Sequence, residues 1–163
     1  EEQVDHVVFS YHGLPESNVK KADTEGVCKF GSCCEQITDK NRLCYRAQCV
    51  GTTKNVVAAL GWSEDRYSMA FQSRFGRQAW IQPYLDDHLE TLLSSGCKKI
   101  AVVTPSFVSD CLETIHEIGI EYREEFMEGG GEVFQLVPNL NDEPVWFSSV
   151  YEISQRYLRK NQE

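Results

Sequence analysis

The stretch Val7-Val8-Phe9-Ser10-Tyr11-His12-Gly13-Leu14-Pro15 decides the fold of this chain. An apolar run that ends in a polar turn containing Gly and Pro predicts a buried strand with its carboxyl end at an open sheet edge. In α/β proteins that edge is where ligands bind. The residue delivered there is His12, whose ring can accept or donate a proton near neutral pH. A histidine that only caps the turn is the alternative.

Apolar runs and helical patterns alternate through the rest of the chain. Because strands that alternate with helices favour a parallel sheet, the pattern predicts a three-layer α/β domain with helices on both faces. Glycines at 61, 96 and 129–131 mark helix ends. The expected strands are Val4–Ser10, Tyr67–Gln72, Lys99–Thr104 and Val133–Val137, and the expected helices are Arg46–Leu60, Tyr84–Ser95, Cys111–Met127 and Val145–Arg159.

Composition narrows the classes of partner. The 163 residues suit one domain, and the net charge of −9 argues against nucleic acid, which requires basic patches. The same charge is compatible with a divalent cation. Apolar runs are shorter than the roughly 20 residues of a membrane-spanning helix. Since the chain opens at Glu1 without an initiator Met, we expect a fragment of a longer protein.

Five of the seven cysteines crowd into one segment, from about residue 20 to residue 45 and just beyond. This polar segment, with Lys20–Asn41 at its centre, interrupts the α/β rhythm and reads as an insertion. One dense cluster and an odd total do not resemble a disulfide framework. We therefore expect a cytoplasmic protein whose clustered cysteines bind metal. The cluster comprises Cys28, Cys33, Cys34, Cys44 and Cys49.

The helix after the third strand is acidic. Asp110 as N-cap and Glu113 three residues later form a capping-box pattern, which is the structural interpretation of Glu113. Glu113, Glu117 and Glu121 also stack on one helical face, as either a solvated acidic surface or oxygen donors for a divalent cation. Glu113 and His12 would then face each other as metal ligand and base. The expected apolar stripe of this helix is Leu112, Ile115, Ile118, Tyr122 and Phe126.

Three blocks of sequence carry a resemblance to a known family. They are Ser10–Pro15, Phe71–Trp80 and Ser109–Thr114, and in this order they resemble the ferrochelatases, which insert ferrous iron into protoporphyrin. The resemblance covers nearly all of the chain outside the cysteine segment, but only about half of a typical member. It implies the C-terminal one of two similar α/β domains, with the preceding half forming the opposite wall of a porphyrin cleft.

The resemblance implies a role for individual residues. His12 and Glu113 match the metal-site and catalytic residues of the family, and Glu117 and Glu121 match its acidic metal path. Tyr11 and Trp80 would line the porphyrin cleft, although plain core packing is an alternative for Trp80. Two positions depart from the pattern: Cys111 stands where some members have histidine, and the matching tyrosine, Tyr45, is displaced by the insertion.

The implied function is insertion of Fe²⁺ into protoporphyrin IX, the last step of haem biosynthesis. Coproporphyrin, a cobalt chelatase of the same fold, and a metal- or cluster-sensing binding module are alternatives. The implied partners are porphyrin, ferrous iron and the preceding half of the enzyme, with peripheral membrane attachment left open. Without that half we expect the isolated chain to be inactive.

Some ferrochelatases carry a 2Fe–2S cluster, and the cysteine segment resembles such a site. Structural Zn²⁺ is the main rival, and disulfides or idle thiols are the remaining alternatives. We expect that the adjacent Cys33 and Cys34 do not both act as ligands. The hypothesised set is Cys28, one or both of Cys33 and Cys34, Cys44, and Cys49 as a fifth candidate.

Overall fold

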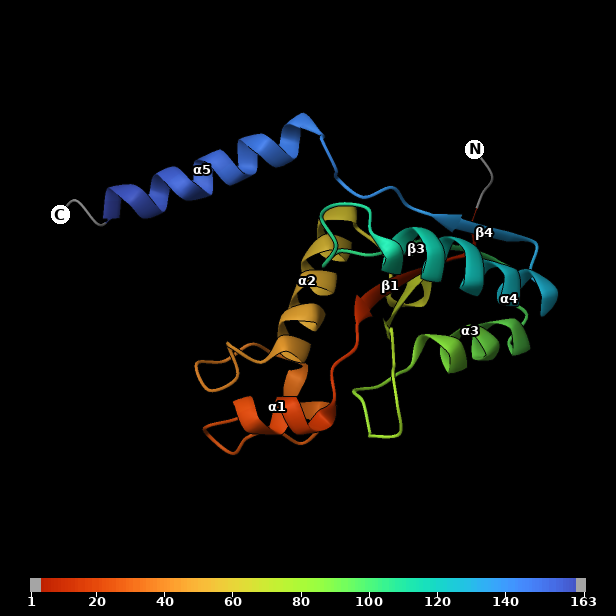
Figure 1. Cartoon of the computed structure of the whole chain (residues 1–163), viewed down its shortest axis with the longest axis horizontal. Coiled ribbons are helices and arrows are strands. Elements are labelled where there is room, and N and C mark those ends of the chain that lie inside the picture. Colours follow the sequence, from red (N-terminus) through yellow and green to blue (C-terminus); the bar gives the residue numbers. More distant parts are fainter. Residues whose placement is uncertain (1–3, 161–163) are drawn as a thin grey trace.

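A four-stranded parallel sheet forms the centre of the molecule in the computed structural model, which describes residues 4–160 (Figure 1). Its order is β2-β1-β3-β4, and every neighbouring pair is parallel. The predicted α/β architecture is therefore confirmed. The strands are β1 (His6–His12), β2 (Tyr67–Gln72), β3 (Lys99–Val103) and β4 (Val133–Leu136).

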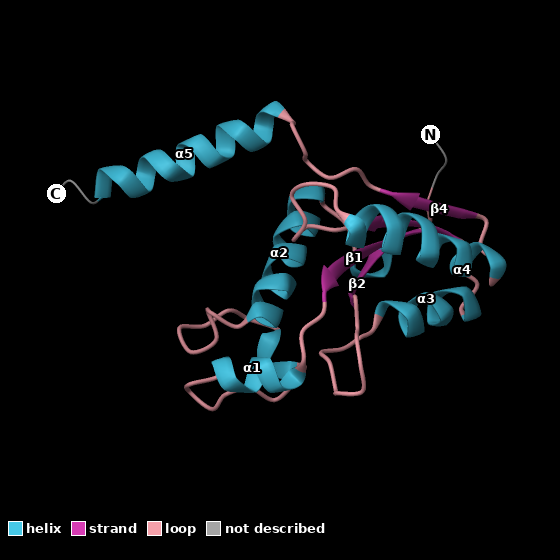
Figure 2. Ribbon diagram, in the orientation of Figure 1, coloured by secondary structure: helices cyan, strands magenta, loops and turns pink. Residues whose placement is uncertain are grey.

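Helices follow each strand along the chain (Figure 2). The segment after β3 winds as a π-helix, labelled η3, before it continues as an ordinary α-helix. Two short 3-10 turns lie at Ser32–Cys34 and Glu64–Arg66. The helices are α1 (Glu16–Ala22), α2 (Tyr45–Leu60), α3 (Leu85–Ser94), η3 (Glu113–Tyr122), α4 (Arg123–Glu128) and α5 (Pro144–Lys160).

The alternation of side chains along β1 builds two separate cores, one on each face of the sheet. Val7, Phe9 and Tyr11 pack on the face covered by α2. Val8 packs on the opposite face, against residues of α3, the π-helix and α4. Because successive residues of a strand point to opposite faces, Ser10 and His12 belong to the same side as Val8. This alternation brings His12 to the side of the π-helix.

Several predicted boundaries move by one or two residues. The first strand is His6–His12 rather than Val4–Ser10, because its pairing with β2 continues to Gln72. The short helix α1 was not predicted; it begins directly after Pro15 and occupies the start of the expected insertion. The cysteine segment that follows, from Asp23 to Cys44, contains one 3-10 turn and otherwise lacks regular structure.

The predicted capping box of Asp110 and Glu113 is wrong. The residue before the π-helix is Leu112, and no side chain caps it. The carboxylate of Asp110 instead accepts hydrogen bonds from the amides of Asn139 and Asn141, at 3.0 and 2.9 Å. A tertiary contact with the loop after β4 has therefore replaced the local one, and Glu113 is free of a capping role.

The expected apolar stripe is only partly buried. Ile118 and Phe126 lie in the core, whereas Leu112 is 73% exposed and Ile115 is 54% exposed. The reason is the π-helix, which closes hydrogen bonds between residues five apart instead of four. The 3.6-residue spacing used to predict the stripe therefore does not hold over this segment. Two large apolar side chains are left on the surface beside Glu113.

The last helix, α5, extends away from the sheet (Figures 1 and 2). It exposes a series of apolar side chains, although an amphipathic helix normally buries one face. Among the residues that the structure describes, no helix is long and apolar enough to cross a bilayer. The exposed apolar residues of α5 are Val145, Phe147, Val150, Tyr151, Ile153, Tyr157 and Leu158.

Candidate active site

The strand order places a switch point between β1 and β3. From β1 the chain passes through α2 to β2 on one side, and from β2 it returns through α3 to β3 on the other. Ligands of open α/β sheets bind at the carboxyl ends of the strands beside such a point. His12 is the last residue of β1, and the loop after β3 leads to Glu113. The switch point therefore explains why these two residues share one edge of the sheet.

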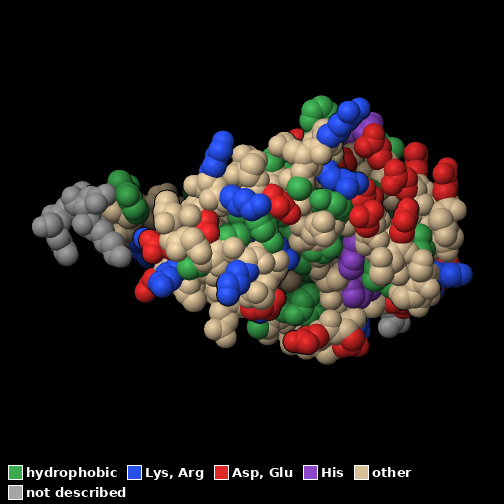
Figure 3. All heavy atoms as spheres, turned by 90° about the horizontal axis from the view of Figure 1, so that it is seen from below, with side chains coloured by type: hydrophobic (Ala, Val, Ile, Leu, Met, Phe, Trp, Pro, Cys, Tyr) green, Lys and Arg blue, Asp and Glu red, His purple; other side chains and the backbone are tan. Residues whose placement is uncertain are grey.

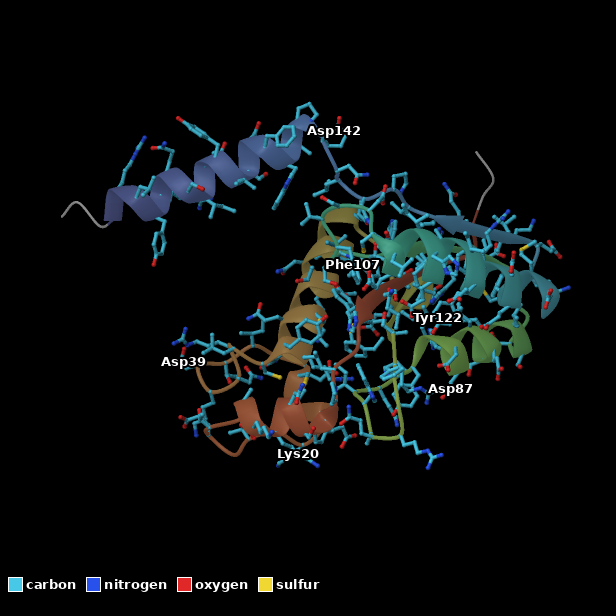
Figure 4. The ribbon with its side chains drawn as sticks, in the orientation of Figure 1. Lys20, Asp39, Asp87, Phe107, Tyr122 and Asp142 are labelled. Atoms are coloured by element: carbon cyan, nitrogen blue, oxygen red, sulfur yellow. The ribbon has the colours of Figure 1, made fainter. Side chains whose placement is uncertain are left out.

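The imidazole of His12 is held in a defined orientation. Its Nδ1 lies 2.7 Å from the carbonyl oxygen of Gly13, which can only accept, so Nδ1 carries the hydrogen. In the neutral ring the lone pair is then on Nε2. The rings of Trp80 and Phe107 are its aromatic neighbours, each with its centroid 6.4 Å from that of His12. Figure 4 shows Phe107 on the loop that follows β3. Sequence reasoning had not singled out Phe107.

Glu113 begins the π-helix, and its backbone carbonyl accepts a hydrogen bond from the side chain of Gln72, the register partner of His12 in the sheet. Its own backbone N–H and the Cys111 thiol hydrogen-bond the carboxylate, and with the charge of His12 they lower the pKa of Glu113 from its usual value. The carboxylate is therefore ionised at neutral pH. An ionised oxygen donor beside an imidazole lone pair is an arrangement that can bind a divalent cation.

The other two predicted metal-path residues differ in their surroundings. Glu117 turns towards the end of β2, where its carboxylate accepts hydrogen bonds from Gln72 and Ser73. Glu121 is exposed and lies 3.5 Å from Nδ1 of His116. Figure 3 shows Asp and Glu side chains gathered on the side of the molecule where α3 and α4 lie. The three glutamates of the π-helix therefore have different surroundings. Glu113 lies at the candidate site, the carboxylate of Glu117 bonds the end of β2, and Glu121 is exposed to solvent.

Comparison with known proteins identifies the family. The ferrochelatase family model matches residues 1–158. This chain belongs to the ferrochelatase family. It is 45% identical to a ferrochelatase of Legionella pneumophila (strain Corby) over 148 residues, 91% of this chain and 44% of that protein. It is 41% identical to a ferrochelatase of Coxiella burnetii (strain Dugway 5J108-111) over 158 residues, 96% of this chain and 45% of that protein. The chain spans less than half the length of these relatives.

The family resemblance suggested Tyr11 and Trp80 as cleft-lining residues, but the structure buries both. Tyr11 is 2% exposed, and its hydroxyl hydrogen-bonds the hydroxyl of Thr53 in α2 at 2.8 Å. Burial raises the pKa of Tyr11 to about 12. Because Tyr11 points to the opposite face of the sheet from His12, it packs under α2 and not beside that ring, and its role in a cleft stays a prediction. Trp80 is 7% exposed and its indole N–H bonds Phe75, so only the ring edge near His12 is close to the site.

Tyr45 anchors the candidate site from α2. Its hydroxyl donates to the backbone carbonyl of His12 at 2.8 Å. Tyr45, the tyrosine that the insertion displaces in the sequence pattern, therefore contacts His12 in the folded chain. The cysteine segment separates the two residues only along the sequence. Sequence reasoning noted the residue without assigning it a role.

Replacing Tyr45 with phenylalanine is expected to lower the free energy of unfolding by about 1 kcal/mol, because a partly buried carbonyl loses its hydrogen-bond donor. Urea unfolding followed by far-UV circular dichroism measures this change. Tyr67→Phe, in another partly buried tyrosine of the same core, is the matched control and should change stability by less than about 0.5 kcal/mol. Equal effects of the two substitutions would contradict the anchoring role.

A second site lies between α1 and the cysteine segment of this ferrochelatase-family chain. Four thiols, Cys28, Cys33, Cys34 and Cys44, line one cavity of about 270 Å³. Lys20 on α1 and Asp39 on the loop mark this region in Figure 4. Cys49 does not line the cavity; it is 3% exposed in the core, where burial raises the pKa of its thiol to about 12. Of the five candidate cysteine ligands, Cys49 therefore lies apart from the four that share the cavity.

Two of the cavity thiols are already at ligand spacing. The sulfur atoms of Cys33 and Cys34 are 3.7 Å apart. Two thiolates on one tetrahedral metal, each about 2.3 Å from it, lie about 3.8 Å apart. The backbone N–H of Lys29 donates to the sulfur of Cys33 at 3.3 Å. Although burial opposes it, this N–H and the neighbouring thiols lower the pKa of Cys33. The adjacent pair is therefore compatible with joint ligation, contrary to our expectation from sequence.

A zinc ion and a 2Fe–2S cluster make different demands on these thiols. A structural zinc ion requires four ligands around one point. A 2Fe–2S cluster takes two thiolates on each of two separate irons. The four thiols that line the cavity, two of them 3.7 Å apart, supply the number of ligands that either group requires.

Proposed function

We propose that this chain is the C-terminal half of a ferrochelatase that inserts Fe²⁺ into protoporphyrin IX. The observation that carries the proposal is the orientation of His12, whose Nδ1 bonds Gly13 while Gln72, its register partner, holds the backbone of Glu113. Membership of the ferrochelatase family supports the same conclusion. The relatives named ferrochelatase are about twice this length, which supports the proposal that the chain is one half of such an enzyme.

The reaction exchanges two protons for one cation. A porphyrin loses two pyrrole N–H protons and gains Fe²⁺, while the iron loses its water ligands. Nε2 of His12 would accept the first pyrrole proton, release it to solvent, and then accept and release the second in the same way. The ionised Glu113 would replace water on the incoming iron, and Glu121 on the outer part of the π-helix would bind it earlier on its path. Both protons leave as the neutral macrocycle becomes a neutral iron complex.

The site requires a further wall. Phe75 and Leu112 are 83% and 73% exposed, and Ile115 beside Glu113 is also largely exposed. Exposed apolar side chains around a polar centre mark a surface that is covered in the working protein. We propose that the porphyrin lies here and that the part of the relatives beyond this chain covers it and packs on α5. The isolated chain would then be inactive.

We also propose that Cys28, Cys33, Cys34 and Cys44 hold a 2Fe–2S cluster. When bound, the cluster would cross-link a segment that has little regular structure of its own, from Asp23 to Cys44. Lys29 would donate its N–H to a cluster ligand. The cysteines join the end of α1, which follows His12, to the start of α2, which carries Tyr45.

The test is metal insertion by the full-length protein under anaerobic conditions. Protoporphyrin IX and Fe²⁺ are mixed with the protein, and loss of free-base porphyrin fluorescence is followed with the absorption of the metal complex. We expect turnover with protoporphyrin IX and Fe²⁺. Faster turnover with coproporphyrin, or with Co²⁺ in place of Fe²⁺, would replace the proposed substrate, and no insertion of any metal would refute the function.

A further inference from the structure

Both oxygens of the Glu117 carboxylate accept hydrogen bonds from the end of β2. Its Oε1 accepts from the N–H of Ser73 at 2.7 Å, and its Oε2 accepts from the Ser73 hydroxyl at 2.6 Å. The side-chain amide of Gln72 donates to Oε2 as well, at 3.1 Å. Hydrogen bonds to an ionised acceptor are among the strong ones in proteins. These three bonds occupy most of the roughly four acceptor positions of the carboxylate and fix its orientation.

These bonds hold an unusual backbone conformation. Ser73 has φ +63, in the left-handed region that residues with a Cβ seldom occupy. Both the backbone N–H and the hydroxyl of this residue bond Glu117. Strained residues of this kind persist where the surrounding structure over-determines them, and they gather at functional sites. Glu117 therefore fixes the corner at which the chain leaves β2.

The amide of Gln72 extends the contact to both candidate metal-site residues. Gln72 is 1% exposed, and its Cα is the register partner of His12 in the sheet. Its Oε1 accepts from the Ser10 hydroxyl at 2.7 Å, two residues before His12. Its Nε2 donates to the backbone carbonyl of Glu113 at 2.9 Å. One buried side chain thus joins the strand of His12 to the backbone of Glu113.

We propose that Glu117 and Gln72 form a clamp that sets the position of Glu113 relative to His12, and that Glu117 is a positioning residue and not a metal ligand. The carboxylate orients the Gln72 amide, and the amide holds the first turn of the π-helix against the sheet. The consequence for catalysis rests on the proposed function. The clamp itself rests only on the contacts of Ser10, Gln72, Ser73, Glu113 and Glu117.

Glu117→Gln in the full-length protein tests the clamp, because in either orientation the new amide nitrogen would face a donor, the Gln72 amide or the Ser73 N–H. We expect kcat to fall about tenfold or more, as small displacements of reacting groups do, while the KM for Fe²⁺ changes less than about twofold. NMR of ¹⁵N-labelled protein should show shifts of the Gln72 side-chain amide and the His12 ring. Glu124→Gln, the same change at an exposed residue of α4, should leave activity and both signals unchanged.

A higher KM for Fe²⁺ with kcat preserved would identify Glu117 as a metal ligand and overturn the clamp. If the unsubstituted protein inserts no metal, the proposed function fails, and an unshifted Gln72 amide in Glu117→Gln would then refute the clamp on its own. Should Glu117→Gln not fold, Ser73→Gly removes only the hydroxyl bond and allows the positive φ. We expect that variant to shift the same signals and to lower kcat by about threefold; unchanged signals would contradict the clamp.

Discussion

Replacing His12 with alanine is expected to reduce metal insertion by the full-length protein about 100- to 10,000-fold, the range for loss of a general acid–base group. The reason is the ring orientation. With Nδ1–H bonded to Gly13 at 2.7 Å, the imidazole has one lone pair left, on Nε2. Alanine has no group that could accept the pyrrole proton, and water has no fixed position there. The loss should appear in kcat for Fe²⁺ insertion into protoporphyrin IX, measured by porphyrin fluorescence.

His88→Gln is the matched control for this substitution. His88 is partly buried and hydrogen-bonds the hydroxyl of Ser68 in β2, well before the carboxyl end of that strand. Glutamine can keep that bond, so the control should insert metal at nearly the rate of the unsubstituted protein. Far-UV circular dichroism shows whether each variant is folded. A folded His12→Ala protein with turnover within threefold of the unsubstituted protein would remove His12 from the reaction.

Replacing both Cys33 and Cys44 with serine is expected to abolish the visible absorption of anaerobically purified protein. The unsubstituted chain should contain about two irons and two acid-labile sulfides, as a 2Fe–2S cluster does. The double variant removes two of the four thiols that line the cavity, and we expect its iron content to fall at least about tenfold. Because the segment from Asp23 to Cys44 has little regular structure, loss of the cluster should also increase its proteolysis.

Cys97→Ser is the control, since Cys97 is partly buried at the start of β3 and lies outside the cavity. It should keep the full iron and sulfide content. A colourless unsubstituted protein with one zinc would replace the cluster with a zinc site, and one without metal would refute both. In either case the proposal for His12 and Glu113 would stand, because the cavity thiols do not contribute to that site.

The sequence alone was enough to predict the parallel α/β fold, because the signals for each strand and helix lie within that element or next to it along the chain. Each strand is a short apolar run, and glycine marks the end of each helix before the next strand, so the order of elements follows from neighbours along the chain. The predicted strand Tyr67–Gln72 agrees with β2 at both ends. His12 and Glu113 were found in the same way, because both follow a strand and strand ends gather at one sheet edge.

Tertiary structure decided what each side chain at that edge contacts. Tyr11 and His12 are adjacent in sequence, but their side chains point to opposite faces of the sheet. Helix α2 packs on the face of Tyr11 and buries that side chain. Cys49 belongs to the core and not to the thiol cavity, although only four residues separate it from Cys44. Neither outcome could be predicted from spacing, since each depends on an element distant in sequence.

The acidic helix is the clearest case. Its sequence predicts an ordinary α-helix with a capping box, and the three glutamates look equivalent. In the structure, the carboxylate of Asp110 accepts a hydrogen bond from the loop after β4. The carboxylate of Glu117 accepts hydrogen bonds from Gln72 and Ser73. Glu113, at the start of the π-helix, and the exposed Glu121 are the two glutamates left for the proposed metal chemistry. The sequence alone therefore determined which residues reach the sheet edge, whereas long-range hydrogen bonds, formed only when the strands are assembled, determined what each of them can do there.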